Sequence, residues 1–149
     1  MTGMYFEEFS VGQKIVSAAR TVTESDIQSF AGLTGDHNRI HTDEEFAKGT
    51  PYGQRIAHGL LGLSMAVGLL MQTGMLEDTV IAFREILEWK FVKPVFIGDS
   101  IHVVVEVKEL KEMPRVGGGL AMVALVVKNQ KDDMLMHGTL SVLVASKSR

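Results

Sequence analysis

An almost wholly apolar run near the middle of the chain constrains the fold more than any other feature. Residues 58–72 read His-Gly-Leu-Leu-Gly-Leu-Ser-Met-Ala-Val-Gly-Leu-Leu-Met-Gln. A helix at a protein surface usually has a polar face, so the lack of one predicts a helix that is buried on every side. The small residues Gly59, Gly62 and Ala66 lie at helical spacing, which predicts a close approach of neighbouring backbone.

A membrane-spanning helix is the alternative for this run. A span needs roughly 18 uninterrupted apolar residues. The run at residues 58–72 is shorter, begins at a histidine and lacks the basic flanks that are typical of a span. These features favour the core of a globular domain.

The second half of the chain shows the two-residue period of strands. Four apolar residues at every second position from Ile101 to Val107 predict a strand with one polar face. Residues 120–128 are apolar on both faces, which is typical of a central strand or an interface strand. A further strand is expected at residues 135–145, joined to the previous one by a hairpin at residues 131–133.

Another extended segment, residues 79–91, precedes these strands. Residues 93–99 connect it to the next strand, and residues 113–119, which contain a proline and three consecutive glycines, predict a mobile loop. Alternation in residues 79–91 predicts an apolar face and a charged face, formed respectively by Ile81, Phe83, Leu87 and Trp89 and by Arg84, Glu88 and Lys90.

The first third of the chain predicts smaller elements. Residues 13–22 favour a short or peripheral strand. Thr23 and Asp26 form a capping-box pattern before apolar residues at helical spacing, so a short helix is expected to end at Gly35. Residues 36–51 are expected to be mostly irregular, with a helical turn near residues 43–48.

These elements predict the fold class. One apolar helix followed by a meander of four antiparallel strands is an α+β layout in which the sheet wraps around the helix. A chain of 149 residues can bury one core without disulfides or structural metals, so residues 1–149 are expected to form a single domain.

Composition excludes several classes of function. The chain has no cysteine, which rules out disulfides, thiolate nucleophiles and cysteine-ligated zinc, and makes a cytoplasmic location the default expectation. Residues 1–8 are acidic and lack the basic and apolar regions of a secretory signal, so no export is expected. The net charge of −3, without a basic stripe, argues against nucleic acid as a partner.

Candidate functional residues are concentrated between Gly35 and Gly59, a segment that contains three of the five histidines. Asp36 and His41 are five residues apart, so a regular helix would separate them by about 140° and only an irregular backbone brings them together. A convergent carboxylate and imidazole can hold one water for acid/base chemistry. The simpler alternative is that Asp36 caps a turn and His41 binds a loop carbonyl.

His58 and Gly59 open the apolar helix. Free backbone N–H groups and the helix dipole at this point favour negative charge, as on a carbonyl group that becomes enolate-like. The alternative is that Gly59 only permits tight packing and His58 only caps the turn. Both interpretations are open at this stage.

Other reactive chemistries agree less well with the spacing. A metal site formed by His37, His41 and His58 matches no H-E-x-x-H pattern, so no metal is expected. Ser64 has no Gly-x-Ser-x-Gly context, which argues against a serine nucleophile. The two remaining histidines lie in strand patterns and are expected to be structural.

Two blocks of sequence resemble the MaoC-like, (R)-specific enoyl-CoA hydratases. Residues 30–43 read Phe-Ala-Gly-Leu-Thr-Gly-Asp-His-Asn-Arg-Ile-His-Thr-Asp and, with Ile-Ala-His-Gly at residues 56–59, closely resemble the hydratase motif of that family. Residues 89–99, Trp-Lys-Phe-Val-Lys-Pro-Val-Phe-Ile-Gly-Asp, resemble the strand and turn that follow its central helix. The resemblance therefore covers most of the chain.

This resemblance implies the hot-dog fold, in which a strongly bent antiparallel sheet wraps a long helix, usually in dimers whose sheets join side by side. It implies a hydratase that converts trans-2-enoyl-CoA into (3R)-hydroxyacyl-CoA, reversibly and without a metal or redox cofactor. The implied partners are an acyl-CoA or acyl-carrier substrate and a second copy of the chain. A hot-dog thioesterase and a non-catalytic acyl-thioester-binding subunit are the alternatives.

The resemblance also implies roles for individual residues. Asp36 and His41 would activate one water for syn addition, with the proton-returning member left open. The Gly59 N–H would polarise the thioester carbonyl, while Asn38 and His58 would support the loop.

Two departures from the family bear on rate and substrate preference. Arg39 stands where the family commonly has proline, and Val67 falls where some hydratases have serine. Arg39 frees the loop backbone and adds a charge near the expected site, whereas Val67 removes a hydroxyl that could hydrogen-bond there.

Overall fold

The computed structural model describes residues 3–147, so Met1 and Thr2 of the acidic amino-terminal segment lie outside the described residues. In chain order the elements are η1 (Phe6–Glu8), β1 (Lys14–Val16), β2 (Arg20–Thr21), α1 (Glu24–Thr34), α2 (Arg39–Thr42), α3 (Glu44–Lys48), α4 (Gly59–Gln72), β3 (Val80–Phe91), β4 (Ser100–Met113), η2 (Pro114–Val116), β5 (Gly118–Lys128) and β6 (Met134–Ala145).

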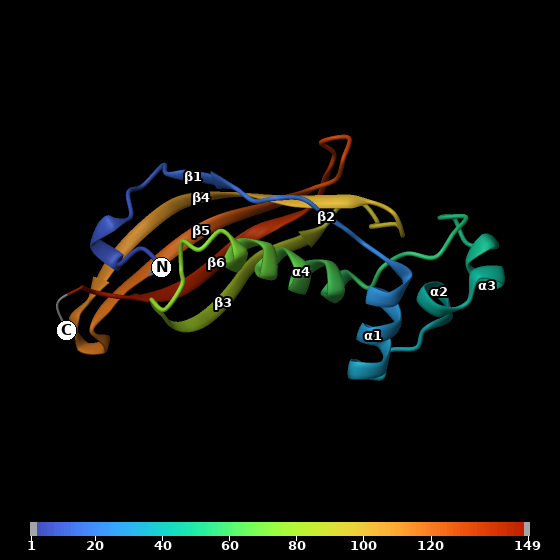
Figure 1. Ribbon diagram of the computed structural model, residues 1–149, viewed down its shortest axis with the longest axis horizontal. Coiled ribbons are helices and arrows are strands. Elements are labelled where there is room, and N and C mark those ends of the chain that lie inside the picture. The colour runs from blue at the N-terminus through green and yellow to red at the C-terminus, as the bar shows by residue number, and fades with distance from the viewer. Residues whose placement is uncertain (1–2, 148–149) are drawn as a thin grey trace.

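The six strands form one antiparallel sheet in the order β1-β4-β5-β6-β3, and β2 pairs with β4. Helix α4 runs along one face of the curved sheet, while α1, α2 and α3 gather beyond one end of it (Figure 1). The predicted α+β layout is confirmed. The predicted central position of the strand at residues 120–128, now β5, is also confirmed. The strand predicted at residues 13–22 is peripheral, as expected, and consists of β1 and β2.

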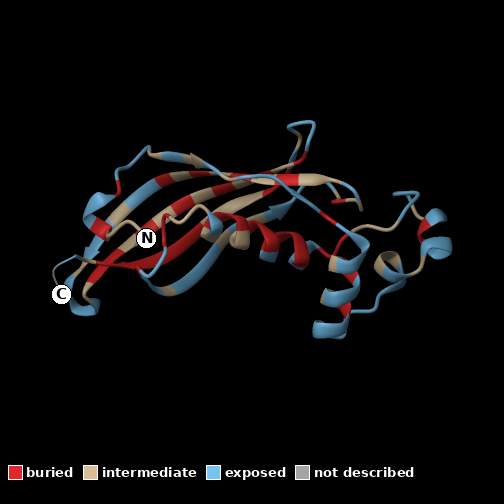
Figure 2. Cartoon of the chain, in the orientation of Figure 1, coloured by how far each residue is buried: buried red, intermediate tan, exposed pale blue. Residues whose placement is uncertain are grey.

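The core lies between α4 and the sheet. Every second residue from Ile101 to Val107 is buried, as the alternation predicts, in the same hydrophobic cluster as the leucines of α4 (Figure 2). A Cβ added at Gly62 would lie 2.7 Å from Met136 Cε, so the small-residue stripe does let the sheet approach the helix closely. No helix within residues 3–147 has the length and apolarity that crossing a membrane requires.

The prediction that α4 is buried on every side is wrong. Leu60 is 62% exposed and Ser64 is also exposed, because the sheet covers only one side of the helix. An apolar side of α4 therefore faces outward in the single chain.

The prediction of two clean faces for β3 is also wrong. Its pairing with β6 shifts register at three places, and each shift breaks the alternation of side chains between faces. At the last shift Glu88 has a φ of 52°, which is uncommon for a residue other than glycine. Ile81 and Phe83, predicted to lie on the apolar face, are 42% and 40% exposed at the edge of the sheet.

The predicted loop at residues 113–119 is shorter than expected. Gly118 and Gly119 belong to β5, where a Cβ would collide with Val144 and Phe6 respectively. Only η2 and Gly117, with a φ of 72°, make the turn between β4 and β5. The glycines thus serve close packing of the strand.

The predictions for the first third are largely confirmed. Thr23 and Asp26 form the capping box of α1, and that helix ends at Gly35 with a φ of 83°. The helical turn expected near the end of residues 36–51 is α3. Helix α2, which carries His41, was not predicted.

Candidate active site

The chain between α1 and α2 makes a tight polar turn. After the left-handed Gly35, the Asp36 N–H donates to Thr34 Oγ1 at 3.2 Å. Asp36 Oδ1 then accepts from the Asn38 N–H at 3.2 Å, and Asn38 Oδ1 accepts from the Ile40 N–H at 3.2 Å. Each polar side chain thereby fixes the backbone two residues later, and Asn38 caps α2.

His41 is held by the main chain of a distant segment. Its Nδ1 lies 2.7 Å from the carbonyl oxygen of Ile56. A carbonyl only accepts, so Nδ1 carries a hydrogen, and in the neutral imidazole Nε2 therefore has the lone pair. Nε2 makes no hydrogen bond within residues 3–147. The exposed side of this imidazole is therefore a proton acceptor.

His58 contacts both Asp36 and His41. It is 2% exposed, and its Nε2 donates to the Asp36 carbonyl oxygen at 2.9 Å. The His58 ring stacks on the His41 ring with centroids 3.9 Å apart, and Phe30 packs against it at 4.9 Å. His58 therefore connects the start of α4 to the turn at Asp36, whereas His37 is exposed and lies outside this group.

These contacts bring Asp36, His41 and His58 together, with one polar side-chain atom of each within 4.8 Å of the others. The simpler sequence interpretation is correct about two of the contacts: Asp36 caps a turn and His41 binds a loop carbonyl. The same three residues nevertheless bring a carboxylate oxygen of Asp36 within 4.8 Å of a ring nitrogen of His41. Turn capping and convergence are thus compatible.

A metal ion suits this cluster less well than water does. The His41 and His58 rings are inclined by only 27°, so their nitrogen lone pairs lie in nearly parallel planes. A zinc ion needs lone pairs that converge at about 2.0–2.1 Å from each nitrogen. In addition, one nitrogen of each ring is already bound to a main-chain carbonyl.

Gly59 begins α4 directly after His58, and its N–H donates to no acceptor within the described part of the chain. It borders a cavity of about 300 Å³. The lining is mainly apolar and comprises Tyr52, Ile56, Ala57, Gly59, Phe91, Val92, Lys93, Pro94, Val95 and Met136. A free helix-terminal N–H beside an apolar cavity can bind an oxygen atom of an apolar ligand.

The two residues that depart from the family pattern lie apart from the cluster. Arg39 bonds to Asp43, and its side chain is 64% exposed. Val67 lies on α4 and is half-buried. Sequence reasoning missed Ile56 and Phe30, because a main-chain carbonyl and a packing ring leave no recognisable polar pattern.

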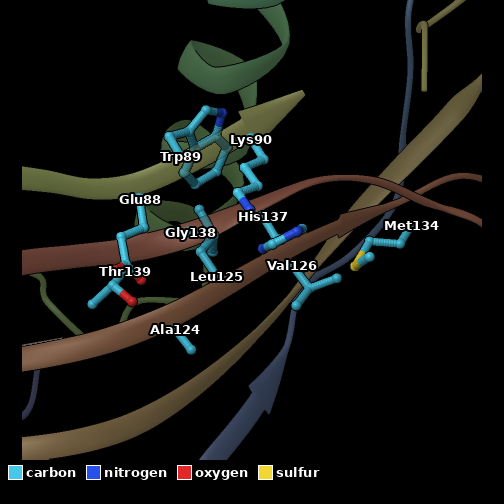
Figure 3. Close-up of a pocket in the computed structure, with 10 residues that line it drawn as sticks. All are labelled: Glu88, Trp89, Lys90, Ala124, Leu125, Val126, Met134, His137, Gly138 and Thr139. Atoms are coloured by element: carbon cyan, nitrogen blue, oxygen red, sulfur yellow. The ribbon is translucent and has the colours of Figure 1, made fainter. Parts of the chain in front are cut away.

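A larger hollow, about 540 Å³, lies on the sheet face opposite α4 and contains none of the predicted site residues (Figure 3). His137 and Thr139 line it beside Ala124 and Val126 of β5. The cavity at Gly59 is smaller, but it adjoins the polar cluster. We therefore place the candidate site at Gly59.

Comparison with known proteins identifies the family of the chain. The MaoC-like domain family matches residues 7–129 of the chain. The (R)-specific enoyl-CoA hydratase of Rhodospirillum rubrum is 39% identical over 106 residues, which cover 71% of this chain and 71% of that enzyme.

Two solved structures are similar over nearly the whole chain. The monoamine oxidase regulatory protein from Archaeoglobus has a TM-score of 0.90 and 40% identity, covering 99% of this chain and 97% of that one. The (R)-hydratase from Aeromonas caviae has a TM-score of 0.78 and 28% identity, covering 91% of this chain and 97% of that one. The predicted hot-dog architecture is confirmed, and the chain belongs to the MaoC-like dehydratase family.

Proposed function

We propose that this protein is an (R)-specific enoyl-CoA hydratase, which adds water to a trans-2-enoyl thioester and also catalyses the reverse dehydration. The single observation that carries the proposal is that a carboxylate oxygen of Asp36 and a ring nitrogen of His41 lie within 4.8 Å of each other, while the Ile56 carbonyl occupies only Nδ1 of that ring. The hydratase named above, 39% identical, supports the same reaction class. The substrate is an acyl-CoA or an acyl carrier thioester.

The two acceptors suit a single water molecule. A water between Asp36 and His41 donates one hydrogen to the carboxylate and the other to Nε2, which leaves an oxygen lone pair free to attack Cβ. The O–H bond breaks as the C–O bond forms, and the dyad then returns a proton to Cα. Delivery from one side makes the addition syn.

Gly59 is the proposed site for the thioester carbonyl. As Cβ gains the water oxygen, the electron pair of the double bond moves toward that carbonyl, which becomes an enolate. The free Gly59 N–H at the positive end of α4 stabilises the negative charge. Asn38 and His58 support the dyad by capping α2 and by binding the Asp36 carbonyl.

The proposed assembly is a homodimer that pairs β3 with β3 of a second copy. β3 is an edge strand, so its outward backbone groups have no partner strand in the single chain. Ile81, Phe83 and Ile86 are each at least 40% exposed along it, and Leu60 adds the uncovered side of α4. Such a self-complementary apolar edge is typical of a two-fold interface.

The reaction class is tested with crotonyl-CoA. Hydration removes the absorbance of the conjugated thioester, and we expect this signal without release of free thiol. Thiol release without hydration would instead identify a thioesterase. Binding of acyl-CoA with neither signal, across several chain lengths, would show a non-catalytic subunit and end the proposal.

The dyad is tested with Asp36→Asn and His41→Ala. Each variant should lose roughly 10²–10⁴-fold in kcat, because each removes a positioned acid/base group. Thermal melting serves as the folding control, since Asp36 is exposed and neither side chain belongs to the apolar core. A folded variant with near-parental hydration would remove that residue from the mechanism.

A further inference from the structure

A cluster of three side chains on α2 and α3 has no part in the proposed chemistry. The Arg39 guanidinium donates to Asp43 Oδ2 at 3.2 Å from Nε and at 3.1 Å from Nη2. Its Cζ lies 4.5 Å from the centre of the Phe46 ring. Asp43 Oδ1 accepts from the Phe46 N–H at 3.0 Å, so the cluster closes on itself and joins the two helices.

Helix α2 needs support from outside itself. It has four residues, and a helix of a single turn is not stable alone. Arg39 stands at its first position, where the helix dipole disfavours a cation. The Asp43 carboxylate offsets this charge, while the Asp43 N–H donates to the Arg39 carbonyl at 2.9 Å and closes the turn. The turn closed in this way contains His41.

We propose that Arg39, Asp43 and Phe46 form a clamp, here named the α2 clamp, that positions His41 for catalysis. Arg39 is then a positioning residue, because its contacts are with Asp43 and Phe46. The inference rests on the proposed function in one respect, that His41 takes part in the reaction. The order of α2 itself does not depend on it.

The backbone conformation at Asn38 and Arg39 is compatible with a proline at position 39, which could order α2 without the Arg39–Asp43 ion pair. Asn38 has φ −53° and ψ 133°, the conformation that a following proline requires. The Arg39 N–H donates to no acceptor among residues 3–147, so its loss breaks no bond. Proline is also favoured at the first position of a helix. Arg39→Pro should therefore order α2 without the ion pair.

The decisive measurement compares kcat and KM in Arg39→Ala, Asp43→Asn and Arg39→Pro. Asparagine keeps a cap for the Phe46 N–H but removes the carboxylate charge. An exposed ion pair and a cation–π contact together correspond to an effect of roughly tenfold, so Arg39→Ala should lose about that factor in kcat. We expect an unchanged KM, no further loss on adding Asp43→Asn, and recovery in Arg39→Pro.

Amide hydrogen exchange of the ligand-free protein gives a readout that needs no activity. The amides of His41 and Asp43 should exchange faster in Arg39→Ala and return to parental rates in Arg39→Pro. Lys48→Ala is the matched control, because Lys48 pairs with Glu45 at 2.8 Å on α3 and forms no side-chain hydrogen bond or ion pair with α2 among the described residues. It should change neither kcat nor exchange.

Two outcomes overturn the inference. If Arg39→Ala keeps the parental kcat and the parental amide exchange rates at His41 and Asp43, the α2 clamp does not position His41. A kcat loss that Arg39→Pro does not restore would show that the Arg39 charge acts directly on substrate. The parent protein could hydrate no substrate and still show faster amide exchange in Arg39→Ala and parental exchange in Arg39→Pro. That result would refute the proposed function, whereas the conclusion that the α2 clamp orders α2 would hold.

Discussion

Main-chain carbonyls fix the protons of both imidazoles in the site. The Ile56 carbonyl assigns the hydrogen of His41 to Nδ1, and the Asp36 carbonyl assigns that of His58 to Nε2. His58 Nδ1 is then a buried lone pair without a partner among the described residues. The backbone thus decides which nitrogen of His41 is available as an acceptor.

The role of Gly59 is tested by removing its N–H. Gly59→Pro deletes the donor at a helix position that accepts proline. Any Cβ at this site would lie 2.9 Å from Phe91 Cε1, so Gly59→Ala is the matched control that shares this Cβ contact and keeps the N–H. We expect kcat of the proline variant to fall about 10²–10³-fold below that of the alanine variant. Equal kcat values in the two variants would rule out the N–H as a donor to the substrate.

At the scale of elements, Asp43 gives the α2–α3 segment a dependence on pH. The Phe46 N–H and then the Arg39 guanidinium hold the pKa of the Asp43 carboxyl below its ordinary value of 3.8. Since the pKa of Asp43 is lower in the folded state, the ionised carboxylate stabilises the fold. This contribution to the free energy of unfolding is complete at pH values above 3.8 and is lost as the pH falls through the lowered pKa.

The measurement is the difference in melting temperature between the parent and Asp43→Asn across this acidic range. The parent should melt at a higher temperature than Asp43→Asn at neutral pH. This difference in melting temperature should disappear as the pH falls below the lowered pKa of Asp43. Glu7 and Glu106 also have lowered pKa values, but they are present in both proteins and cancel in the difference. A difference that is constant with pH would contradict the assignment.

The elements that sequence predicts well are those whose signals are local. Thr23 and Asp26 cap α1 through neighbouring atoms, and the alternation from Ile101 to Val107 follows from strand geometry. Helix α2 escaped prediction because Arg39 is held by side chains on the next turns. The bulges of β3 escaped it because their register is set by β6.

The candidate site was predictable in its members but not in its geometry. The motif singled out Asp36, His41 and Gly59, yet an irregular turn at residues 37–38 and the start of α2 separate the first two. Their convergence depends on contacts with residues 56–58, and no local rule supplies these. A metal site that included His37 was considered from spacing, whereas the structure groups Asp36 with the other two histidines.

At the scale of the whole molecule, the homodimer proposal predicts a solution mass twice the 16.3 kDa of the chain. Phe83→Glu places a charge on the exposed apolar edge of β3 and should give a monomer by light scattering at micromolar concentration. Val16→Lys is the control, because Val16 is 61% exposed on β1 at the opposite edge of the sheet. A parent mass near that of one chain would refute the dimer.

Different parts of the chain determine the proton positions on His41 and His58 and the shape of the neighbouring cavity. Main-chain carbonyls bind the two imidazoles. Since backbone atoms set the proton positions, substitutions that preserve the main chain leave the reacting edge of the site as it is. The cavity at Gly59 is instead shaped by side chains such as Phe91 and Met136. Under the proposed function, libraries confined to those cavity positions would change substrate choice and leave the proposed acid/base pair unaltered.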